Sequence, residues 1–293
     1  MTVGERVIFR ILGALRAGVG GEPVDLGGRR ARLVLAALLL EPGRAVPVDR
    51  LIDVVWPDRP PASARTQVAI AVSGLRRTFR QAGCADEVIE TVRPGYRILT
   101  RAIDALAAEE RIGAARRDVA AGRPAKAAER FRDALALWDG PVLAGLDRPA
   151  IEAAAHRWEE LRLTAVEERA RVELMLGRHH ELVGELVGPV GEQPYRERLR
   201  ALLMIALARA GRRGEALDVY HAGRRRLNDD LGLEPGRELR DLHMAILRDD
   251  PSTHPRAPAA SYRGPALRWR RTSRFPATVK GHRARAARRP PRG

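Results

Sequence analysis

The alternation of apolar and polar residues along the first hundred positions predicts short strands and then helices. Three β-like pieces at residues 7–12, 14–17 and 23–26 are separated by glycines, and together they predict a small antiparallel sheet. Residues 29–40 follow a helical pattern that is apolar almost all round, so we expect the most buried helix of this region there. A short amphipathic helix is predicted within residues 46–56, with its apolar side chains at Val48, Leu51, Ile52 and Val55.

Residues 63–80 carry the clearest amphipathic pattern. Pro60 and Pro61 mark a boundary before this stretch, and the Ser63 hydroxyl is a candidate N-cap. An apolar stripe with the spacing i, i+4, i+7 and i+11 comprises Val68, Val72, Leu75 and Phe79. The opposite face is small, polar and basic, and it comprises Thr66, Gln67, Ile70, Ser73, Gly74 and Arg77, with Arg65, Arg76 and Arg80 on its flanks. Such a helix can lie in a DNA major groove, although an ordinary amphipathic surface helix has the same pattern.

A β-hairpin is predicted after this helix. Residues 88–92 and 96–99 favour strands, and the turn between them holds Arg93, Pro94 and Gly95. The predicted order of sheet, three helices and hairpin is the plan of a winged helix-turn-helix. Within that plan we expect Trp56 to pack the turn between the second and third helices, and Tyr96 to pack the hairpin.

Residues 102–250 are helical by pattern almost throughout. Helices are predicted at residues 104–121, 125–137 and 149–176. Glycine–arginine pairs at 122, 177 and 211 mark comparable turns, and the last two lie 34 residues apart, which is the tetratricopeptide period. The first spacing, 55 residues, departs from that period. We therefore expect an irregular stack of helix pairs with a concave protein-binding surface.

The charge of the chain is concentrated at its ends. The 293 residues carry a net charge of +16, of which residues 1–101 supply +6 and residues 251–293 supply +12. This balance favours a polyanionic partner, nucleic acid before membrane. Residues 251–293 hold seven prolines, 12 basic side chains and no acidic one, which predicts a basic disordered tail. Its interleaved aromatic side chains would permit stacking on nucleic acid, but the composition favours a solvated tail with no selected role.

Other features predict a soluble intracellular protein without catalytic chemistry. Cys84 is the only cysteine, and no apolar run has the length of a signal peptide or a membrane span, so we expect a cytoplasmic location. No Walker A motif or dinucleotide-binding glycine fingerprint is present. His179 and His180 are adjacent and make poor joint metal ligands on a helix. We therefore expect no enzyme, no metal and no cofactor.

Two sets of motifs resemble known bacterial regulators. Three motifs resemble the OmpR/PhoB-type DNA-binding domain: LIDVVWP at 51–57, LRR at 75–77 and ETVRPGYR at 90–97. The bacterial transcriptional activator domain is resembled by ALALWDGP at 134–141, YRERLR at 195–200 and LGLEPGREL at 231–239. Residues 1–250 as a whole resemble the SARP family, the Streptomyces antibiotic regulatory proteins.

The resemblance implies a fold and a domain order. It implies a mostly α fold with a small β part, in which a winged helix-turn-helix precedes an all-α tetratricopeptide-like region. The expected boundaries are 1–101 for the DNA-binding domain and 102–250 for the activator domain, with the basic tail at 251–293. No receiver domain is expected before the winged helix and no nucleotide-binding domain after the helical region.

The resemblance also implies a function. It implies a nucleoid-associated activator of secondary-metabolite genes that binds direct repeats in promoter DNA as a homodimer and recruits RNA polymerase holoenzyme. The expected DNA-contacting residues are Arg65, Thr66, Gln67, Ile70, Ser73, Arg76, Arg77, Arg80, Thr91, Arg93 and Arg97. Thr91 matches a backbone contact on the wing, and Arg93 matches a contact in the minor groove.

One stretch of the third helix departs from the family pattern. Relatives usually carry polar or basic side chains where this chain has Ala69, Ile70, Ala71 and Gly74. Ile70 can contact a thymine methyl, but Gly74 offers no side chain. Direct base recognition is therefore expected to be weaker, with more affinity from phosphates, the wing and oligomerisation. The alternative interpretation is a protein-interaction module that works through the helical repeats and binds DNA weakly or without specificity.

Overall fold

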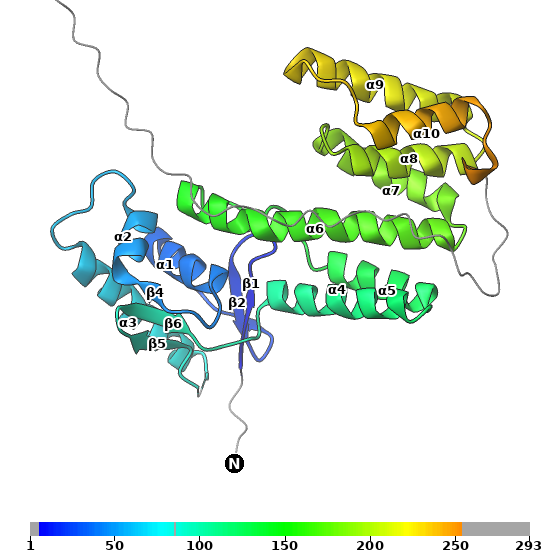
Figure 1. Ribbon diagram of the computed structural model, residues 1–293. Coiled ribbons are helices and arrows are strands. Elements are labelled where there is room, and N and C mark those ends of the chain that lie inside the picture. The colour runs from blue at the N-terminus through cyan, green and yellow to red at the C-terminus, as the bar shows by residue number, and fades with distance from the viewer. Residues whose placement is uncertain (1–5, 85, 254–293) are drawn as a thin grey trace, which may run out of the picture. The chain divides into compact units, whose positions relative to one another are not determined.

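The computed structural model describes residues 6–84 and 86–253. The predicted basic tail therefore lies outside the described residues apart from its first three positions. The chain is mostly helical with two small antiparallel sheets, which confirms the predicted fold class. Figure 1 shows the strands and first three helices of the winged helix-turn-helix, followed by the helical region from α4 onward.

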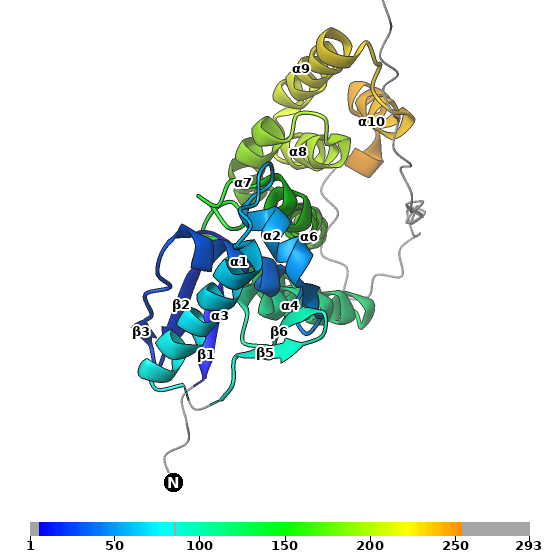
Figure 2. The ribbon, with the colours of Figure 1, turned by 90° about the vertical axis from the view of Figure 1, so that its left-hand side faces the viewer.

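The first sheet comes from the N-terminal segment, as the glycine-separated pattern predicts. Strands β1 (Val7–Arg10), β2 (Arg16–Val19) and β3 (Glu22–Pro23) pair antiparallel in that order. Side chains alternate along β1, so Val7 and Phe9 are buried while Ile8 and Arg10 are exposed. Figure 2 shows α3 across this sheet, where the ring of Phe79 meets that of Phe9 edge-on at 5.6 Å between centroids.

Three helices complete the DNA-binding motif. They are α1 (Arg29–Leu40), α2 (Val48–Val55) and α3 (Ala64–Gln81). All eight residues from Leu33 to Leu40 are buried, which confirms that α1 is the central helix. Helix α1 packs against both α2 and α3 because its apolar surface extends around the whole cylinder.

The wing is a hairpin with a third strand added to it. Strands β5 (Ile89–Val92) and β6 (Gly95–Ile98) form the predicted hairpin, and β4 (Val46–Pro47) pairs with the outer side of β6. The sequence does not predict β4 because two residues, one of them proline, carry no alternating pattern. A Cβ on Gly95 would lie 1.9 Å from the carbonyl oxygen of Val46, so only glycine permits this pairing.

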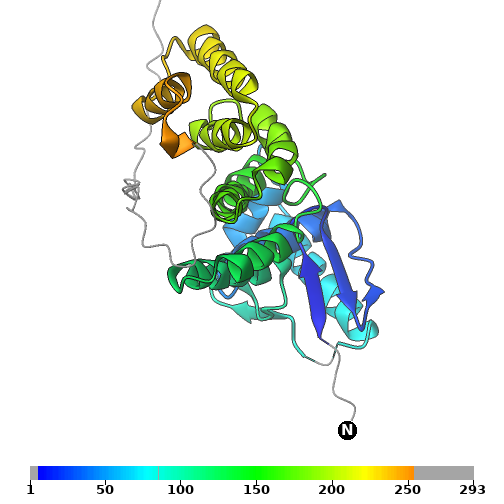
Figure 3. The same ribbon diagram turned by 90° about the vertical axis from the view of Figure 1, so that its right-hand side faces the viewer.

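The remaining elements are helical. In chain order they are α4 (Asp104–Ala120), α5 (Pro124–Leu135), α6 (Pro149–Met175), α7 (His179–Glu192), α8 (Glu197–Arg209), α9 (Arg213–Leu231), α10 (Arg237–Leu247) and a 3-10 turn at Pro251–Thr253. Helices α8, α9 and α10 pack successively on one another (Figure 3). Among the described residues no helix combines the length and apolar character that a bilayer crossing requires.

Three glycine–arginine turns join the helices in pairs: α4 to α5, α6 to α7 and α8 to α9. Gly122, Gly177 and Gly211 all adopt a left-handed conformation, with φ of 70°, 78° and 75°. In each turn the glycine amide donates to the carbonyl oxygen three residues earlier, and the following arginine amide donates to the one five residues earlier. This is the Schellman type of helix end, which glycine adopts without steric cost. The predicted helix pairs are thereby confirmed.

An inserted loop explains the irregular first spacing. The turn at Gly177 follows that at Gly122 by 55 residues because residues 136–148 form a loop of turns and bends between α5 and α6, and α6 is a long helix. The loop runs beside the N-terminal strands. Its amides at Asp139 and Leu143 donate to the carbonyl oxygens of Leu12 and Ile11, at 2.7 and 2.9 Å.

The hydrophobic core continues from the winged helix into the helical region. One cluster of buried side chains unites the first sheet, α1 to α3 and the wing with the loop residues Val142 and Leu143 and with Ile151 and Trp158 of α6. Separate clusters fill the α4–α5–α6 layer and the α7–α10 stack. The predicted boundary at residue 101 therefore separates two motifs that share a core.

Candidate nucleic-acid interface

Helix α3 has a buried stripe and an exposed stripe of identical spacing. Val68, Val72, Leu75 and Phe79 are each no more than 2% exposed. Exposed side chains repeat the same i, i+4, i+7, i+11 pattern two residues earlier, at Thr66, Ile70, Ser73 and Arg77. A shift of two residues is a rotation of about 200° on an α-helix, so the two stripes lie on opposite sides. The predicted buried stripe of α3 is confirmed, whereas Gln67 and Gly74 of the predicted outward face are only half-exposed.

The start of α3 differs in detail from the prediction. Ser63 directly precedes the helix, but its hydroxyl makes no capping bond to a backbone amide. It accepts instead from the side-chain amide nitrogen of Gln67, at 2.9 Å. Ser63 therefore occupies the predicted N-cap position without the predicted capping bond, because its backbone (φ −89°, ψ 10°) is not in the extended conformation that a capping side chain needs.

Two of the flanking arginines of α3 already have partners. Arg65 pairs with Asp49 of α2, and both side chains are largely exposed. Because the pair is exposed, it contributes little to stability and can open toward a phosphate. Arg80 donates to the carbonyl oxygen of Arg76 at 3.3 Å. Arg77 is exposed, and no ion pair of its guanidinium is present within the described part of the chain.

Arg76 is directed toward the wing. Its Nε donates to the carbonyl oxygen of Ile89 at 2.8 Å, and its Nη2 donates to the Thr91 hydroxyl at 2.9 Å. Glu87 lies 3.4 Å from the same guanidinium, which also sits over the Tyr96 ring. These contacts engage the Nε and Nη2 donors of Arg76, so this residue ties α3 to the wing. Tyr96 packs on the hairpin as predicted.

The wing presents one exposed arginine at its tip. Arg93 lies in the turn between β5 and β6 and is exposed, and no acidic partner faces it among the described residues. Arg97 is half-buried and bonded to Glu90, its cross-strand neighbour. Thr91 is exposed, with its hydroxyl accepting from Arg76. The predicted contact residues thus divide into an open set on α3 and the wing tip and a set already engaged within the protein.

Sequence reasoning missed the role of Asp104, which it placed only as the first residue of a helix. Asp104 is buried, and its carboxylate accepts from the backbone amides of Ile11 and Leu12, at 2.9 and 3.2 Å, as well as from that of Ala105. Burial raises the pKa of the Asp104 carboxyl, an effect that the backbone hydrogen bonds and Arg10 oppose. Asp104 therefore joins the helical region to the first sheet.

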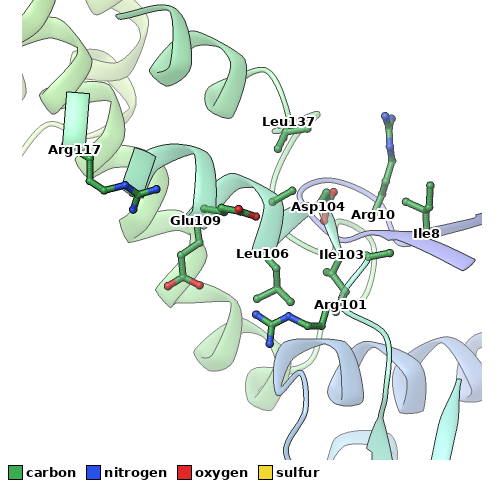
Figure 4. Close-up of a pocket in the computed structure, with 13 residues that line it drawn as sticks. Ile8, Arg10, Arg101, Ile103, Asp104, Leu106, Glu109, Arg117 and Leu137 are labelled. Atoms are coloured by element: carbon green, nitrogen blue, oxygen red, sulfur yellow. The ribbon is translucent and has the colours of Figure 1, made fainter. Parts of the chain in front are cut away.

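A cavity of about 790 Å³ lies beside this junction (Figure 4). Ile8 and Arg10 line it from β1, Arg101 from the connecting segment, and Leu106 and Arg117 from α4. Glu109, also in its wall, is bonded to Arg157 of α6. Basic and acidic side chains line the cavity beside apolar ones. The cavity forms where the first sheet meets α4.

Comparison with known proteins agrees with the order of these two motifs. The family model described as transcriptional regulatory protein, C terminal, matches residues 21–98, and that of the bacterial transcriptional activator domain matches residues 103–247. Regulatory protein DnrI of Streptomyces peucetius is 37% identical over 268 residues, which cover 86% of this chain and 97% of DnrI.

Two further relatives are longer than the aligned segment. Regulatory protein AfsR of Streptomyces coelicolor is 38% identical over 282 residues, covering 95% of this chain but only 28% of AfsR. The solved structure of Mycobacterium tuberculosis EmbR in complex with a low affinity phosphopeptide superposes with a TM-score of 0.80 at 35% identity. That superposition covers 84% of this chain and 66% of EmbR.

The winged helix with its outward-facing α3, followed by paired helices, defines a transcriptional regulator of the bacterial activator type. The alignment covers nearly the full length of DnrI, and this match identifies the family within that class. The chain belongs to the SARP family of transcriptional regulators.

Proposed function

We propose that the chain is a sequence-specific DNA-binding transcriptional activator. Helix α3 enters the major groove with its exposed stripe toward the bases, and the wing lies along the neighbouring backbone. The observation that supports this most directly is the pair of opposed stripes on α3, because a helix anchored along one side presents the other to a partner. The exposed stripe carries no acidic side chain that would repel phosphate.

The open residues divide by chemistry into base and backbone contacts. Thr66 and Ser73 offer short polar groups to base edges, while Arg77 reaches phosphates or a guanine edge. Gln67 and Arg80 join these contacts when their bonds to Ser63 and to the Arg76 carbonyl oxygen open. Arg93 extends from the wing tip into the adjacent minor groove. Arg65 joins these contacts when its exposed pair with Asp49 opens. Arg76 and Arg97 hold the wing in position and act through it.

Membership of the SARP family supports a wider role. We infer that the chain binds direct repeats in double-stranded promoter DNA as a homodimer and recruits RNA polymerase holoenzyme to secondary-metabolite genes. This places its action at the nucleoid, and it calls for no cofactor.

The test is a titration of a chain ending at Pro258 onto promoter DNA from neighbouring biosynthetic genes, beside a scrambled duplex, at several salt concentrations. Removing the 11 basic residues beyond Pro258 prevents their charge from masking specificity. We expect a preference for the promoter that survives near-physiological salt. Arg77→Ala should weaken binding by about 1–3 kcal/mol, whereas Arg225→Ala, at an exposed position of α9, should leave it unchanged.

Equal binding to both duplexes with a steep salt dependence would contradict the proposal. That outcome would leave only phosphate attraction. It would favour the alternative function, a protein-interaction module built on the helix pairs. The observation behind this alternative is that Ala69 and Gly74 offer DNA only a methyl group and no side chain at all on this part of α3.

A further inference from the structure

An isoleucine stands exposed in the middle of the outward stripe of α3. Ile70 is 65% exposed, more than Ile8 or any other large apolar side chain of the described chain. It lies between Thr66 and Ser73 on the stripe opposite the buried one. Isolated apolar side chains are common on protein surfaces, so its position and neighbours decide what its exposure means.

The fold does not require an isoleucine at this position. Ile70 takes no part in any hydrophobic cluster of the described residues. A β-branched side chain also lowers helix propensity, so alanine would suit an exposed helical position better. The stability of the fold therefore does not explain why an isoleucine occupies position 70.

The surroundings leave Ile70 as the protruding group of this face. Ala69 and Ser73 beside it are short, and Gly74 one turn later has no side chain, with open space around it. A helix with small neighbours can approach the floor of the major groove closely. The first contact along this part of the helix would then be an apolar one.

Thymine carries the one apolar group that base pairs present in the major groove, its C5-methyl. We infer that Ile70 is a specificity-determining residue that contacts this methyl, so that the recognised half-site contains a thymine opposite the centre of α3. This inference rests on the proposed function, since it requires α3 to lie in the groove.

The experiment selects bound duplexes from a randomised library with the full chain, and then replaces each selected thymine by deoxyuridine. Deoxyuridine keeps base pairing and removes only the methyl. We expect one thymine whose replacement weakens binding about fourfold, the worth of one buried methyl group. Ile70→Ala should bind the thymine and deoxyuridine duplexes equally.

Ile8→Ala is the matched control. Ile8 is 56% exposed, but it lies on the face of β1 opposite Phe9, the residue that meets α3. This variant should keep the wild-type discrimination. The circular dichroism spectrum of Ile70→Ala should match wild type and its thermal unfolding should not be lowered, because the removed side chain is not packed and alanine favours the helix.

The outcomes separate this inference from the function on which it rests. A selected motif whose binding is indifferent to every thymine methyl would overturn the role of Ile70 and leave sequence-specific binding intact. Unchanged thymine discrimination in Ile70→Ala would do the same. Failure of the wild-type chain to select any motif would overturn both.

Discussion

Gly74 lies beside the exposed stripe of α3, between Ile70 and Arg77 in the sequence, and it offers DNA no side chain. A Cβ built on Gly74 meets nothing within 4 Å, and the residue is helical, so a larger side chain fits without strain. Gly74→Arg should therefore add one phosphate or base contact. We expect tighter binding to promoter DNA and a salt dependence steeper by about one unit in log–log slope.

Gly184→Arg provides the matched control for this change. Gly184 is likewise a glycine inside a helix, α7, and a Cβ built on it also meets open space, although Gly184 is exposed and Gly74 is half-exposed. Both substitutions should stabilise their helices by about 0.5–1 kcal/mol and add one positive charge. Equal effects of the two variants on DNA affinity would argue that α3 does not lie in the groove at Gly74.

The sequence predicted which residues of α3 face outward, but not which of them are available. Spacing alone predicts both the buried stripe, which begins at Val68 and ends at Phe79, and the exposed stripe, which begins at Thr66 and ends at Arg77. The engagement of Arg76 depends on the position of Ile89 and Thr91, which are 13 and 15 residues away. Such contacts depend on tertiary packing that no local pattern contains.

Among the elements, the tie between α3 and the wing has the most direct consequence. Arg76 holds β5 through two hydrogen bonds, so its loss should release the wing and misplace Arg93. We therefore expect Arg76→Ala and Arg93→Ala to weaken DNA binding non-additively. In the Arg76→Ala background, Arg93→Ala should weaken DNA binding by less than it does in the wild-type background.

A double-mutant cycle of dissociation constants checks this coupling. The comparison cycle pairs Arg93→Ala with Arg77→Ala, since Arg77 has no contact with the wing among the described interactions. That cycle should be additive within about 0.3–0.5 kcal/mol. Additivity in the Arg76 cycle as well would show that Arg76 does not act through the wing.

Strong periodicity made the helices predictable, and its absence hid the smallest elements. Helix α1 runs over Arg29–Leu40, the same span as its apolar pattern. Strand β4 has only two residues, and its pairing depends on the close approach that Gly95 allows. The 55-residue spacing signalled an irregularity, but only the structure shows residues 136–148 lying against the N-terminal strands.

For the whole molecule, the buried Asp104 carboxylate links stability to pH. Burial holds its pKa in the folded chain above the ordinary value of 3.8. The folded state therefore binds more protons than the unfolded state at pH values just above 3.8. Its contribution to stability is fully present below that value and is lost as pH rises through the folded pKa.

Urea unfolding of wild type and Asp104→Asn from pH 4 to pH 8 measures this linkage. The advantage of wild type over the variant should be larger at pH 4 than at pH 8, because asparagine does not titrate. Asp104→Ala should cost about 1–3 kcal/mol at neutral pH by leaving the amides of Ile11 and Leu12 unpaired. A wild-type advantage that instead grows toward alkaline pH would contradict the raised pKa.

The loop that lies beside β1 also bears on how such regulators can be recombined. Residues 139–144 supply hydrogen bonds to the Ile11–Gly13 segment, and Trp158 of α6 fills the same core as the DNA-binding helices. In a chimera joined at residue 101, each parent would supply one side of that interface. The two sides would then not be complementary to each other. The part of the chain that must be transferred together therefore extends at least through Trp158 of α6, beyond the boundary of the DNA-binding motif.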